Sequence, residues 1–287
     1  MRDGAFRPPT FAKGRPQAPQ LGHNSPMLGE PSMKHWAGSR TIASLSDRAT
    51  RSASFIAPDA SGDASLAALE LHGPDEMLRS LAGSACRLPS ELERAVPKRK
   101  AEYLAGRVVA AIALSQCGAM DVHVGRNVDG SPRWPAGFVG ALTHGGGLAA
   151  AAAAPASRYA GIGIDAEYLL EPRVREEVAE SIAAPGELAA AQLALSDAMQ
   201  RALPTILFSA KESLFKCLYP QVGEFFGFHD ARFVEAREDG VGAGFFRLEL
   251  VRSLHPTFPR GWGVVGRFAV ANGAVQTAVG VRQWDAR

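Results

Sequence analysis

The sequence predicts an α+β protein built as two halves, each of which combines a helix with strands. Three observations lead to this prediction. The 287 residues are 46% hydrophobic and 21% charged, which is ordinary for a globular protein and leaves ample length for a core. The segment Ser90–Gln116 carries apolar residues at helical spacing. Strand-like runs separated by turn residues occupy the last third, Ala231–Val281.

Residues 1–54 have the composition of a disordered tail. They contain six prolines and many Gly, Ser and Gln, and their apolar residues follow no sustained period. Such a segment buries too little apolar surface to offset the entropy lost on ordering. Its eight Lys and Arg against three Asp and Glu leave two other interpretations open, an Arg-rich transit peptide and a misplaced start codon.

The composition argues against several classes of protein. The net charge of +2 is too small to predict nucleic-acid binding. No stretch approaches the ~20 apolar residues of a membrane span, and the N-terminus lacks the apolar region of a secretory signal. The three cysteines, Cys86, Cys117 and Cys217, are widely spaced and form no CxxC motif. They predict a reducing compartment, the cytoplasm.

The first half begins with two short elements and one long helix. Leu66–Leu71 is compatible with a strand or a short helix, whereas Pro74–Leu81 opens with Pro-Asp-Glu, a typical helix start. The long helix is predicted over Ser90–Gln116. Asp121–Val124 is predicted as a short strand, and the dipeptide Asp129-Gly130 after it indicates a turn.

The glycine-rich stretch Gly140–Gly147 is predicted as a flexible loop, and the alanine-rich run Leu148–Ala154 after it is ambiguous. Alanine favours a helix by propensity. The glycines before the run and Pro155 after it leave only about seven residues. A buried strand lined with small side chains is the competing prediction.

The second half is predicted to start with a strand over Tyr159–Glu167, in which Ile162 and Ile164 alternate with smaller or polar residues. Helices are expected at about residues 172–182, 186–201 and 204–219. The strand-like runs of the last third are Gly244–Val251, Trp262–Ala271 and Ala274–Val281.

The first group of residues suited to chemistry ends the predicted strand, Gly163-Ile-Asp165-Ala-Glu167. Residues two apart on a strand point to one face, so Asp165 and Glu167 would present two carboxylates side by side while Ile164 and Ala166 pack inward. Two adjacent carboxylates repel unless a cation lies between them. Oxygen ligands of this kind suit Mg2+, which also binds substrate phosphates. The alternative is two acids on a solvated strand face. The small, apolar residues directly before the carboxylates argue against it.

A second group lies further along the chain, on a predicted helix. The helical spacing places Phe208, Lys211, Glu212 and Phe215 on one face, which Lys216 extends. The simplest interpretation is a Glu–Lys pair on a surface helix. The two phenylalanines on the same stripe favour a partly buried cleft instead. There, Glu212 could complete a metal site and the lysines could neutralise phosphate oxygens.

A third group is Thr143-His144, directly before three glycines. Glycine-rich loops let a backbone approach a phosphate closely, and a histidine there can donate to it. A turn with an incidental histidine is the alternative. The seven histidines show no zinc-ligand spacing, and Walker A, GxSxG, HExxH and dinucleotide-binding GxGxxG motifs are absent.

Together these motifs resemble those of the 4'-phosphopantetheinyl transferases. The family signature is similar to G-[IV]-D-x-E followed by [FW]-x-x-K-E-[AS]-x-x-K, and Gly163–Glu167 and Phe208–Lys216 match it throughout. Upstream, Arg99–Arg107 and the segment from Trp134 to His144 are similar to the siderophore-synthase, or enterobactin-type, branch. Ala141 and the triple glycine depart from that branch, which bears on substrate preference.

The resemblance covers about residues 70–281 and implies two similar α/β subdomains related by a pseudo-twofold, with coenzyme A bound between them. It implies that Leu148–Ala154 is a strand. The chain would then consist of a disordered tail over 1–54, an N-terminal subdomain over 55–157 and a C-terminal subdomain over 158–287 that carries the magnesium and coenzyme A motifs.

The implied reaction moves 4'-phosphopantetheine from coenzyme A to a serine of an apo acyl or peptidyl carrier protein domain, releasing adenosine 3',5'-bisphosphate. The carriers would serve nonribosomal peptide, siderophore or polyketide synthesis. The resemblance implies Mg2+ on Asp165, Glu167 and Glu212, with Glu212 as general base and Lys216 stabilising the leaving phosphate. The implied coenzyme A-binding residues are Arg99, Arg107, Thr143, His144, Lys211 and Lys216.

The resemblance also implies a cytoplasmic monomer whose partners are coenzyme A and carrier proteins, with no nucleic acid and no membrane span. Two functions of other classes remain open. One is a binding module for coenzyme A or carrier protein without catalysis. The other is a Mg2+-dependent phosphohydrolase that uses the same carboxylates.

Overall fold

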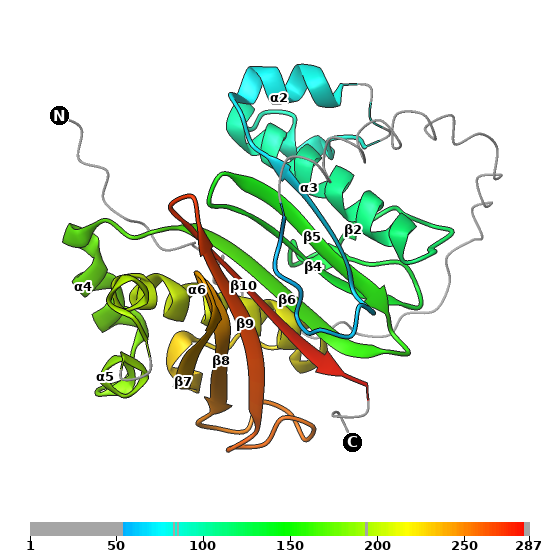
Figure 1. Ribbon diagram of the computed structural model, residues 1–287. Helices are drawn as coiled ribbons and strands as arrows, with labels where there is room; N and C mark the ends of the chain where they lie inside the picture. Colours follow the sequence, from blue (N-terminus) through cyan, green and yellow to red (C-terminus); the bar gives the residue numbers. More distant parts are fainter. Residues whose placement is uncertain (1–53, 83, 85, 193–194, 284–287) are drawn as a thin grey trace. The chain divides into compact units, whose positions relative to one another are not determined.

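The computed structural model describes residues 54–82, 84, 86–192 and 195–283, all within one of the chain's two units, Ala37–Arg287. The predicted tail lies outside these residues except for Ser54. The described residues form antiparallel sheets of three and five strands, each packed against a long helix, and a two-stranded ribbon (Figure 1). The α+β prediction is confirmed.

The first half is a three-stranded sheet covered by two helices. Its strands are β1 (Ser65–Glu70), β5 (Leu148–Pro155) and β4 (Phe138–Gly145), in that spatial order. The helix α2 (Pro74–Leu81) packs on α3 (Pro97–Gln116), and α3 packs on the sheet (Figure 1). The segment Leu66–Leu71, compatible with strand or helix, is a strand up to Glu70, where its pairing with β5 ends.

The alanine-rich run is a strand because both of its faces are covered. Ala149, Ala151 and Ala153 of β5 belong to the core beneath α3. Ala150, Ala152 and Ala154 point the other way, into a core with Ile162 and Ile164 of the second half. Small side chains on both faces let a helix and a second sheet approach one strand, so packing overrides the helical propensity of alanine.

The second half is a five-stranded sheet. Its spatial order is β6 (Tyr159–Tyr168), β10 (Ala274–Arg282), β9 (Gly263–Ala271), β8 (Ala243–Leu250) and β7 (Ala231–Gly240). The predicted strands over residues 159–167 and in the last third are confirmed, but β7 was not predicted. Its solvent-facing residues are largely charged, which hid the strand pattern.

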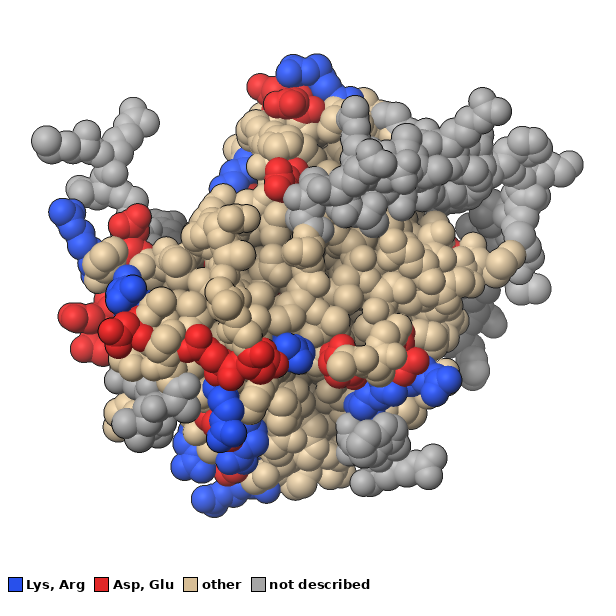
Figure 2. Space-filling view, in the orientation of Figure 1, with Lys and Arg blue, Asp and Glu red and all other residues tan. Residues whose placement is uncertain are grey.

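Opposite charges pair across the solvent face of β7, β8 and β9, and Figure 2 shows basic and acidic side chains interspersed on the face it presents. These ion pairs are Arg232–Glu249, Arg237–Glu235, Arg247–Glu249 and Arg267–Asp239. Of these, Arg232–Glu249 joins the neighbouring strands β7 and β8, and such cross-strand pairs stabilise a sheet face that is open to water.

Three helices follow β6 in sequence. The helix α4 (Pro172–Ile182) confirms its prediction, but the two helices predicted over residues 186–201 and 204–219 are wrong in extent. They are replaced by a short α5 (Glu187–Gln192) and a long α6 (Asp197–Val222) that continues through Pro204. A proline inside a helix removes one backbone hydrogen bond. Burial of α6 side chains on both sides of Pro204 outweighs that loss.

Three further predictions of the first half are corrected. The long helix begins at Pro97 instead of Ser90, because the residue before a proline, here Val96, is extended. The short strand is β2 (Gly125–Arg126), paired with β3 (Pro132–Arg133), and not Asp121–Val124. The stretch Gly140–Gly147 is no flexible loop. It is most of β4 followed by a two-glycine turn, in which both glycines have positive φ, 54° and 79°.

The chain before β1 packs against the second half. Arg282 of β10 pairs with Asp59 at 3.5 Å and Asp63 at 2.7 Å, and lies over the ring of Tyr159. The backbone N–H of Ile56 donates to the side chain of Gln276. The chain thus contacts the second sheet before it enters the first as β1. Within the described ranges, no helix combines the length and apolarity needed to cross a membrane.

Candidate functional site

Glycines bring three elements together around Asp165. A Cβ atom on Gly163 of β6 would lie 1.8 Å from the carbonyl oxygen of Ser213 in α6, so only glycine lets the helix lie this close. A Cβ on Gly145 of β4 would lie 1.9 Å from the carbonyl oxygen of Ala166. The small, apolar lead-in to the carboxylates is therefore a packing requirement that sets α6 and β4 against the end of β6.

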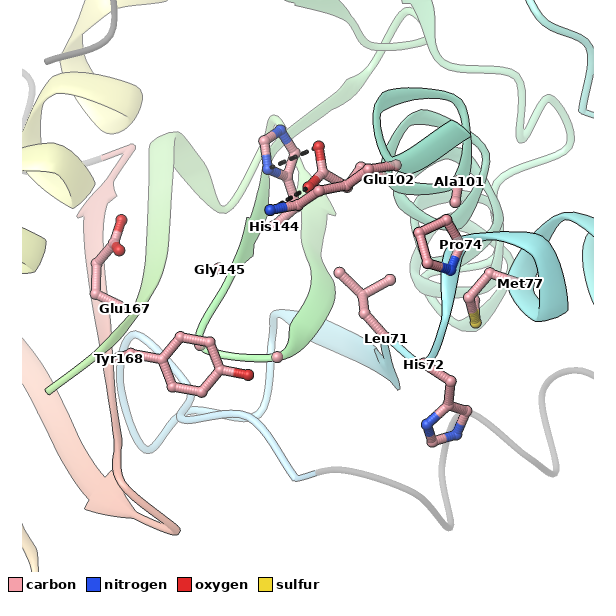
Figure 3. Close-up of a pocket in the computed structure, with 13 residues that line it drawn as sticks. Leu71, His72, Pro74, Met77, Ala101, Glu102, His144, Gly145, Glu167 and Tyr168 are labelled. Atoms are coloured by element: carbon pink, nitrogen blue, oxygen red, sulfur yellow. Dashed lines mark ion pairs between the residues drawn. The ribbon is translucent and has the colours of Figure 1, made fainter. Parts of the chain in front are cut away.

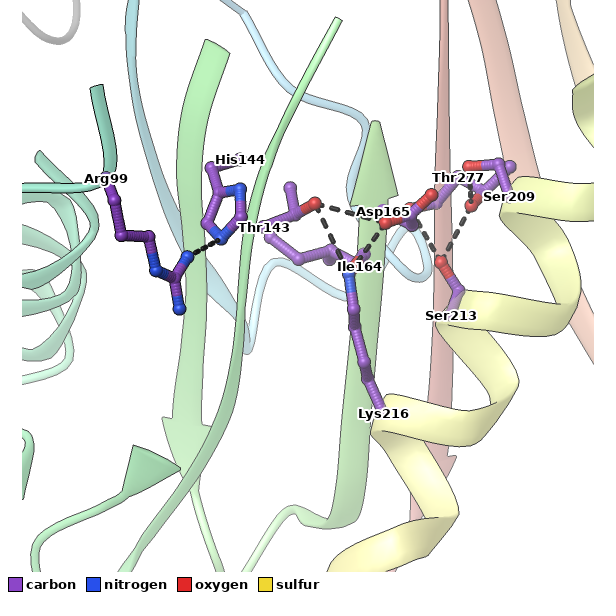
Figure 4. A network of polar contacts seen from close by, with 9 residues as sticks. All are labelled: Arg99, Thr143, His144, Ile164, Asp165, Ser209, Ser213, Lys216 and Thr277. Carbon is purple, nitrogen blue, oxygen red and sulfur yellow. Dashed lines mark hydrogen bonds and ion pairs between the residues drawn. The ribbon is translucent and has the colours of Figure 1, made fainter. Parts of the chain in front are cut away.

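Asp165, Lys216 and Thr143 meet at this junction (Figure 4). Lys216 Nζ donates to Asp165 Oδ1 at 2.6 Å, to the carbonyl oxygen of Ile164 at 3.2 Å and to Thr143 Oγ1 at 3.3 Å. The hydroxyl of Thr143 donates to the same Asp165 oxygen at 3.1 Å. The side chain of Lys216 is 27% exposed and that of Asp165 only 4%, so the cation stands between a buried anion and solvent.

The predicted arrangement of the strand end is only partly correct. Ile164 and Ala166 are buried as expected, but Asp165 is buried too, and Glu167 is half-buried. Behind Asp165, Thr277 of β10 lies opposite it in the strand pairing. Thr277 hydrogen-bonds Ser213 at 2.7 Å and Ser209 at 2.8 Å, both on α6.

This hydroxyl cluster fixes the helix against the sheet at the level of the carboxylate. Sequence reasoning missed it. Its only signal was the spacing of four residues between the two serines, within the second motif.

The charges at the junction perturb one another. Burial, together with the negative charges of Asp165 and Glu212, raises the pKa of Glu167 to about 8, while Lys216 opposes the rise. Burial and the negative charge of Asp165 also raise the pKa of Glu212, while Lys216 opposes the rise. Burial alone would lower the pKa of Lys216, but Asp165 and Glu212 outweigh it and raise the pKa. The protein thus concentrates three carboxylates around one ammonium.

A cavity of about 340 Å3 lies between the two halves of the described unit (Figure 3). Its lining includes His144, the three glycines after it, Glu167 and Tyr168. Of the described residues that line it, only Glu167 and Tyr168, on β6, come from the second half; His144 and the glycines lie on β4 and the turn after it, and Leu71, Met77 and Glu102 also belong to the first half. The cavity therefore has apolar and charged walls and reaches one of the junction's carboxylates.

Arg99 and Glu102 of α3 flank His144. Arg99 Nη1 lies 3.0 Å from His144 Nε2 (Figure 4), and Glu102 lies 4.0 Å from Nδ1 (Figure 3). Removal of water by the surrounding protein lowers the pKa of His144, as do the cations of Arg99 and Lys216, whereas Glu102 raises it. His144 and Thr143 are neighbours on β4. His144 lines the cavity, whereas Thr143 contacts Asp165 at the carboxylate junction.

Two residues predicted to bind coenzyme A are directed elsewhere. Lys211 lies in the core: it donates to the carbonyl oxygen of Ile182 at 2.8 Å and pairs with Glu187 at 2.9 Å, and its side chain is 2% exposed. Arg107 donates to the carbonyl oxygen of Gly125 and stacks on the ring of Tyr103. It stands eight residues along α3 from Arg99, about 12 Å.

The predicted metal ligands lie close together without forming a closed site. Among the residues that the structure describes, no three His, Cys, Asp or Glu side chains are grouped as metal ligands. The charge of Asp165 raises the pKa of both Glu167 and Glu212, but Asp165 Oδ1 is occupied by Lys216. Asp165 Oδ2 is buried, and no described residue hydrogen-bonds it. A hard cation would supply the partner that this oxygen lacks.

Comparisons with known proteins agree with one another. Residues 88–154 match the model of the 4'-phosphopantetheinyl transferase N-terminal domain, and residues 161–258 match that of the 4'-phosphopantetheinyl transferase superfamily. The chain is 34% identical over 196 residues to the 4'-phosphopantetheinyl transferase Npt of Nocardia iowensis, covering 66% of this chain and 85% of the relative.

Two further relatives are the 4'-phosphopantetheinyl transferase PptT of Mycobacterium tuberculosis and the enterobactin synthase component D of Escherichia coli. The first is 32% identical over 202 residues, 67% of this chain and 85% of the relative. The second is 38% identical over 130 residues, 44% of this chain and 58% of the relative.

Proposed function

Because this chain belongs to the 4'-phosphopantetheinyl transferase superfamily, we propose that it transfers 4'-phosphopantetheine from coenzyme A to a serine hydroxyl of an apo carrier protein domain. One observation supports the proposal beyond family membership. The junction of Asp165, Thr143 and Lys216 adjoins a cavity lined by His144 and Glu167. Such a site offers carboxylates to a metal and cations to a pyrophosphate.

The reaction is a displacement at phosphorus. The serine Oγ attacks the β-phosphorus of coenzyme A, and the bond from that phosphorus to the oxygen bridging the α-phosphate breaks. Adenosine 3',5'-bisphosphate leaves, and the serine proton passes to Glu212, which acts as general base. Glu212 is half-buried on α6, one turn before Lys216, so both can face the same substrate.

The cations of the site neutralise charge on coenzyme A. Lys216 offers its ammonium to the phosphate that leaves, where charge develops in the transition state. His144 borders the cavity and Arg99 contacts His144, so both would bind phosphate oxygens, with Thr143 beside them as a hydroxyl donor. Lys211 and Arg107 have no part in this proposal, because the Lys211 ammonium is bonded within the core and the Arg107 guanidinium donates to Gly125 and stacks on Tyr103.

We assign Asp165, Glu167 and Glu212 as the residues that would hold Mg2+. The unpartnered Asp165 oxygen and the mutual repulsion of the three carboxylates both fit a dication. Bound there, Mg2+ would neutralise the pyrophosphate oxygens.

The finer assignments rest on the relatives and on the sequence. The enterobactin synthase relatives support carriers of siderophore or other nonribosomal peptide synthesis. The two family models support a division into subdomains over 55–157 and 158–287. We further propose a cytoplasmic monomer that acts without nucleic acid or membrane.

Intact-mass analysis of an apo peptidyl carrier domain tests the function. After incubation with this protein, coenzyme A and Mg2+, the carrier should gain one phosphopantetheine, and EDTA should prevent the gain. A carrier whose serine is replaced by alanine is the control. No gain on peptidyl, polyketide and fatty-acid carriers would contradict the proposal. Phosphate release from simple esters would then indicate a phosphohydrolase.

A further inference from the structure

We infer that Lys216 is an internal counter-ion that competes with the divalent cation for Asp165 until coenzyme A gives the ammonium another partner. The inference rests on the proposed function, since it concerns the same site. It adds a property that the reaction alone does not require: the metal and coenzyme A each make the other bind more tightly, and Lys216 carries part of that coupling.

The first support is the number of bonds that Lys216 makes. An ammonium has three N–H donors. In this structure they have three acceptors, on Asp165, Thr143 and the backbone of Ile164 (Figure 4). The nitrogen is therefore fully bonded to the wall of the site. A phosphate can gain this ammonium only if Lys216 gives up a wall contact.

The second support is the unequal state of the two Asp165 oxygens. Oδ1 accepts from Lys216 at 2.6 Å and from Thr143 at 3.1 Å. Oδ2 is buried, and the described residues give it no donor. Lys216 thus neutralises the carboxylate charge without satisfying the whole carboxylate. A second cation attracted to Oδ2 would share one small group with an ammonium, and the two positive charges would repel.

The consequence is a linkage between two ligands. While Lys216 remains on Asp165, its positive charge weakens binding of the dication. A coenzyme A phosphate supplies a new acceptor for the ammonium, and withdrawal of Lys216 toward it removes the repulsion. By reciprocity, a bound dication drives Lys216 from Asp165 and strengthens phosphate binding by the same factor.

Mn2+ binding to the purified full-length protein tests this directly, because free Mn2+ is measured by electron paramagnetic resonance without any turnover. In the absence of coenzyme A, Lys216→Met should bind Mn2+ at least ~5-fold more tightly than the wild type. The factor by which coenzyme A tightens Mn2+ binding should fall by at least ~5-fold in the same variant. Lys216→Gln serves as a second variant should the methionine disturb folding.

Two controls separate the local effect from a change in net charge. Lys216→Arg keeps the cation and should retain weak Mn2+ binding. Arg237→Met removes an exposed cation on β7, 61% exposed, and should leave Mn2+ binding unchanged. Unchanged or weaker Mn2+ binding in both neutral Lys216 variants, or no Mn2+ binding in any protein, would overturn the inference.

The outcome is distinguishable from a failure of the proposed function. If the wild type modifies an apo carrier while the neutral variants bind Mn2+ no more tightly, only the counter-ion inference fails. If the variants bind Mn2+ as expected while the wild type modifies no carrier, the transferase proposal fails. The counter-ion would then belong to a metal site of another activity.

Discussion

Two lysines five residues apart on α6 have opposite environments. Lys211 is buried among α4, α5 and the body of α6, and its partner Glu187 also accepts backbone N–H groups of Ala184 and of Phe233 on the edge strand β7. The acceptors of the Lys211 ammonium, the Ile182 carbonyl oxygen and the Glu187 carboxylate, hold α4 and α5 against α6. Lys216 is partly exposed beside a cavity, and its carboxylate partner keeps one oxygen unpartnered among the described residues.

The difference shows how one helix can serve stability and chemistry at once. Residues five apart on a helix point in different directions, since the spacing is 100° per residue. Lys211 therefore ties α6 to the elements on one side, while Lys216 is presented on another. A buried ion pair whose polar atoms are all hydrogen-bonded holds its helices and strands in place. An ion pair with a polar atom that lacks a hydrogen bond can exchange partners.

The largest expected effect is on folding, from Lys211→Met. The substitution leaves the Glu187 carboxylate buried without its cation, which costs about 3–5 kcal/mol of unfolding free energy. Urea unfolding followed by circular dichroism measures this. The double variant Lys211→Met/Glu187→Gln should recover much of the loss, because no uncompensated charge stays buried. Equal stability of Lys211→Met and wild type would remove the structural role of this pair.

The next effect is on turnover, from Lys216→Met. Loss of one positioned charge at the reacting phosphate should lower kcat by about 10^2–10^3-fold. The unfolding free energy should fall less than in Lys211→Met, because Lys216 is 27% exposed and Thr143 still donates to Asp165. Steady-state assays at varied concentrations of coenzyme A and carrier measure kcat and KM. A variant with normal kcat and raised KM would show that Lys216 only binds substrate.

A smaller effect is expected from Thr143→Val. The hydroxyl both donates to Asp165 and accepts from Lys216, so its loss should loosen the ion pair and lower kcat by roughly 10-fold, since a hydrogen bond to a charged group contributes about 1.5–3 kcal/mol. Thr143→Ser keeps the hydroxyl and is the matched control. Equal kcat values for Thr143→Val and Thr143→Ser would contradict this role of the hydroxyl.

The smallest effect concerns the partly exposed ion pairs of Arg282, which anchor the chain before β1. A hydrogen bond from Arg282 holds the pKa of Asp63 below its usual 3.8. Burial would raise the pKa of Asp59, but hydrogen bonds from Ser61 and Tyr159 outweigh it and lower the pKa. A carboxyl with a lowered pKa in the folded state adds stability above its unfolded pKa. That stability is lost as the pH falls through the folded value.

The variant Arg282→Gln should therefore lower the urea midpoint slightly at pH 7, and the gap to the wild type should narrow below about pH 3.8. Urea titrations at several pH values between 2 and 7 measure the gap. A gap that widens on acidification would show that the arginine acts through something other than these carboxylates.

The sequence predicted the elements where local pattern and packing agree. Strand β6 and helix α4 were predicted nearly to the residue. The Asp165–Lys216 neighbourhood followed from two motifs 45 residues apart. What local pattern left undecided depended on distant parts of the chain: Leu148–Ala154, ambiguous by propensity and assigned as a strand through the resemblance, is a strand because α3 and β6 cover both of its faces.

The burial of Lys211 was missed for the same reason. Its partner Glu187 lies 24 residues earlier, and no local feature of the sequence indicates that α5 returns to this side of α6. Burial of Asp165 was also missed, because the covering group, Lys216, comes from another element.

The most direct test of this account is one intact-mass series on an apo peptidyl carrier domain with coenzyme A and Mg2+. The wild type and Lys211→Met/Glu187→Gln should both convert the carrier to the form carrying one phosphopantetheine, while Lys216→Met should leave it almost unmodified over the same time. Conversion by Lys216→Met at the wild-type rate, or no conversion by the wild type, would contradict the account.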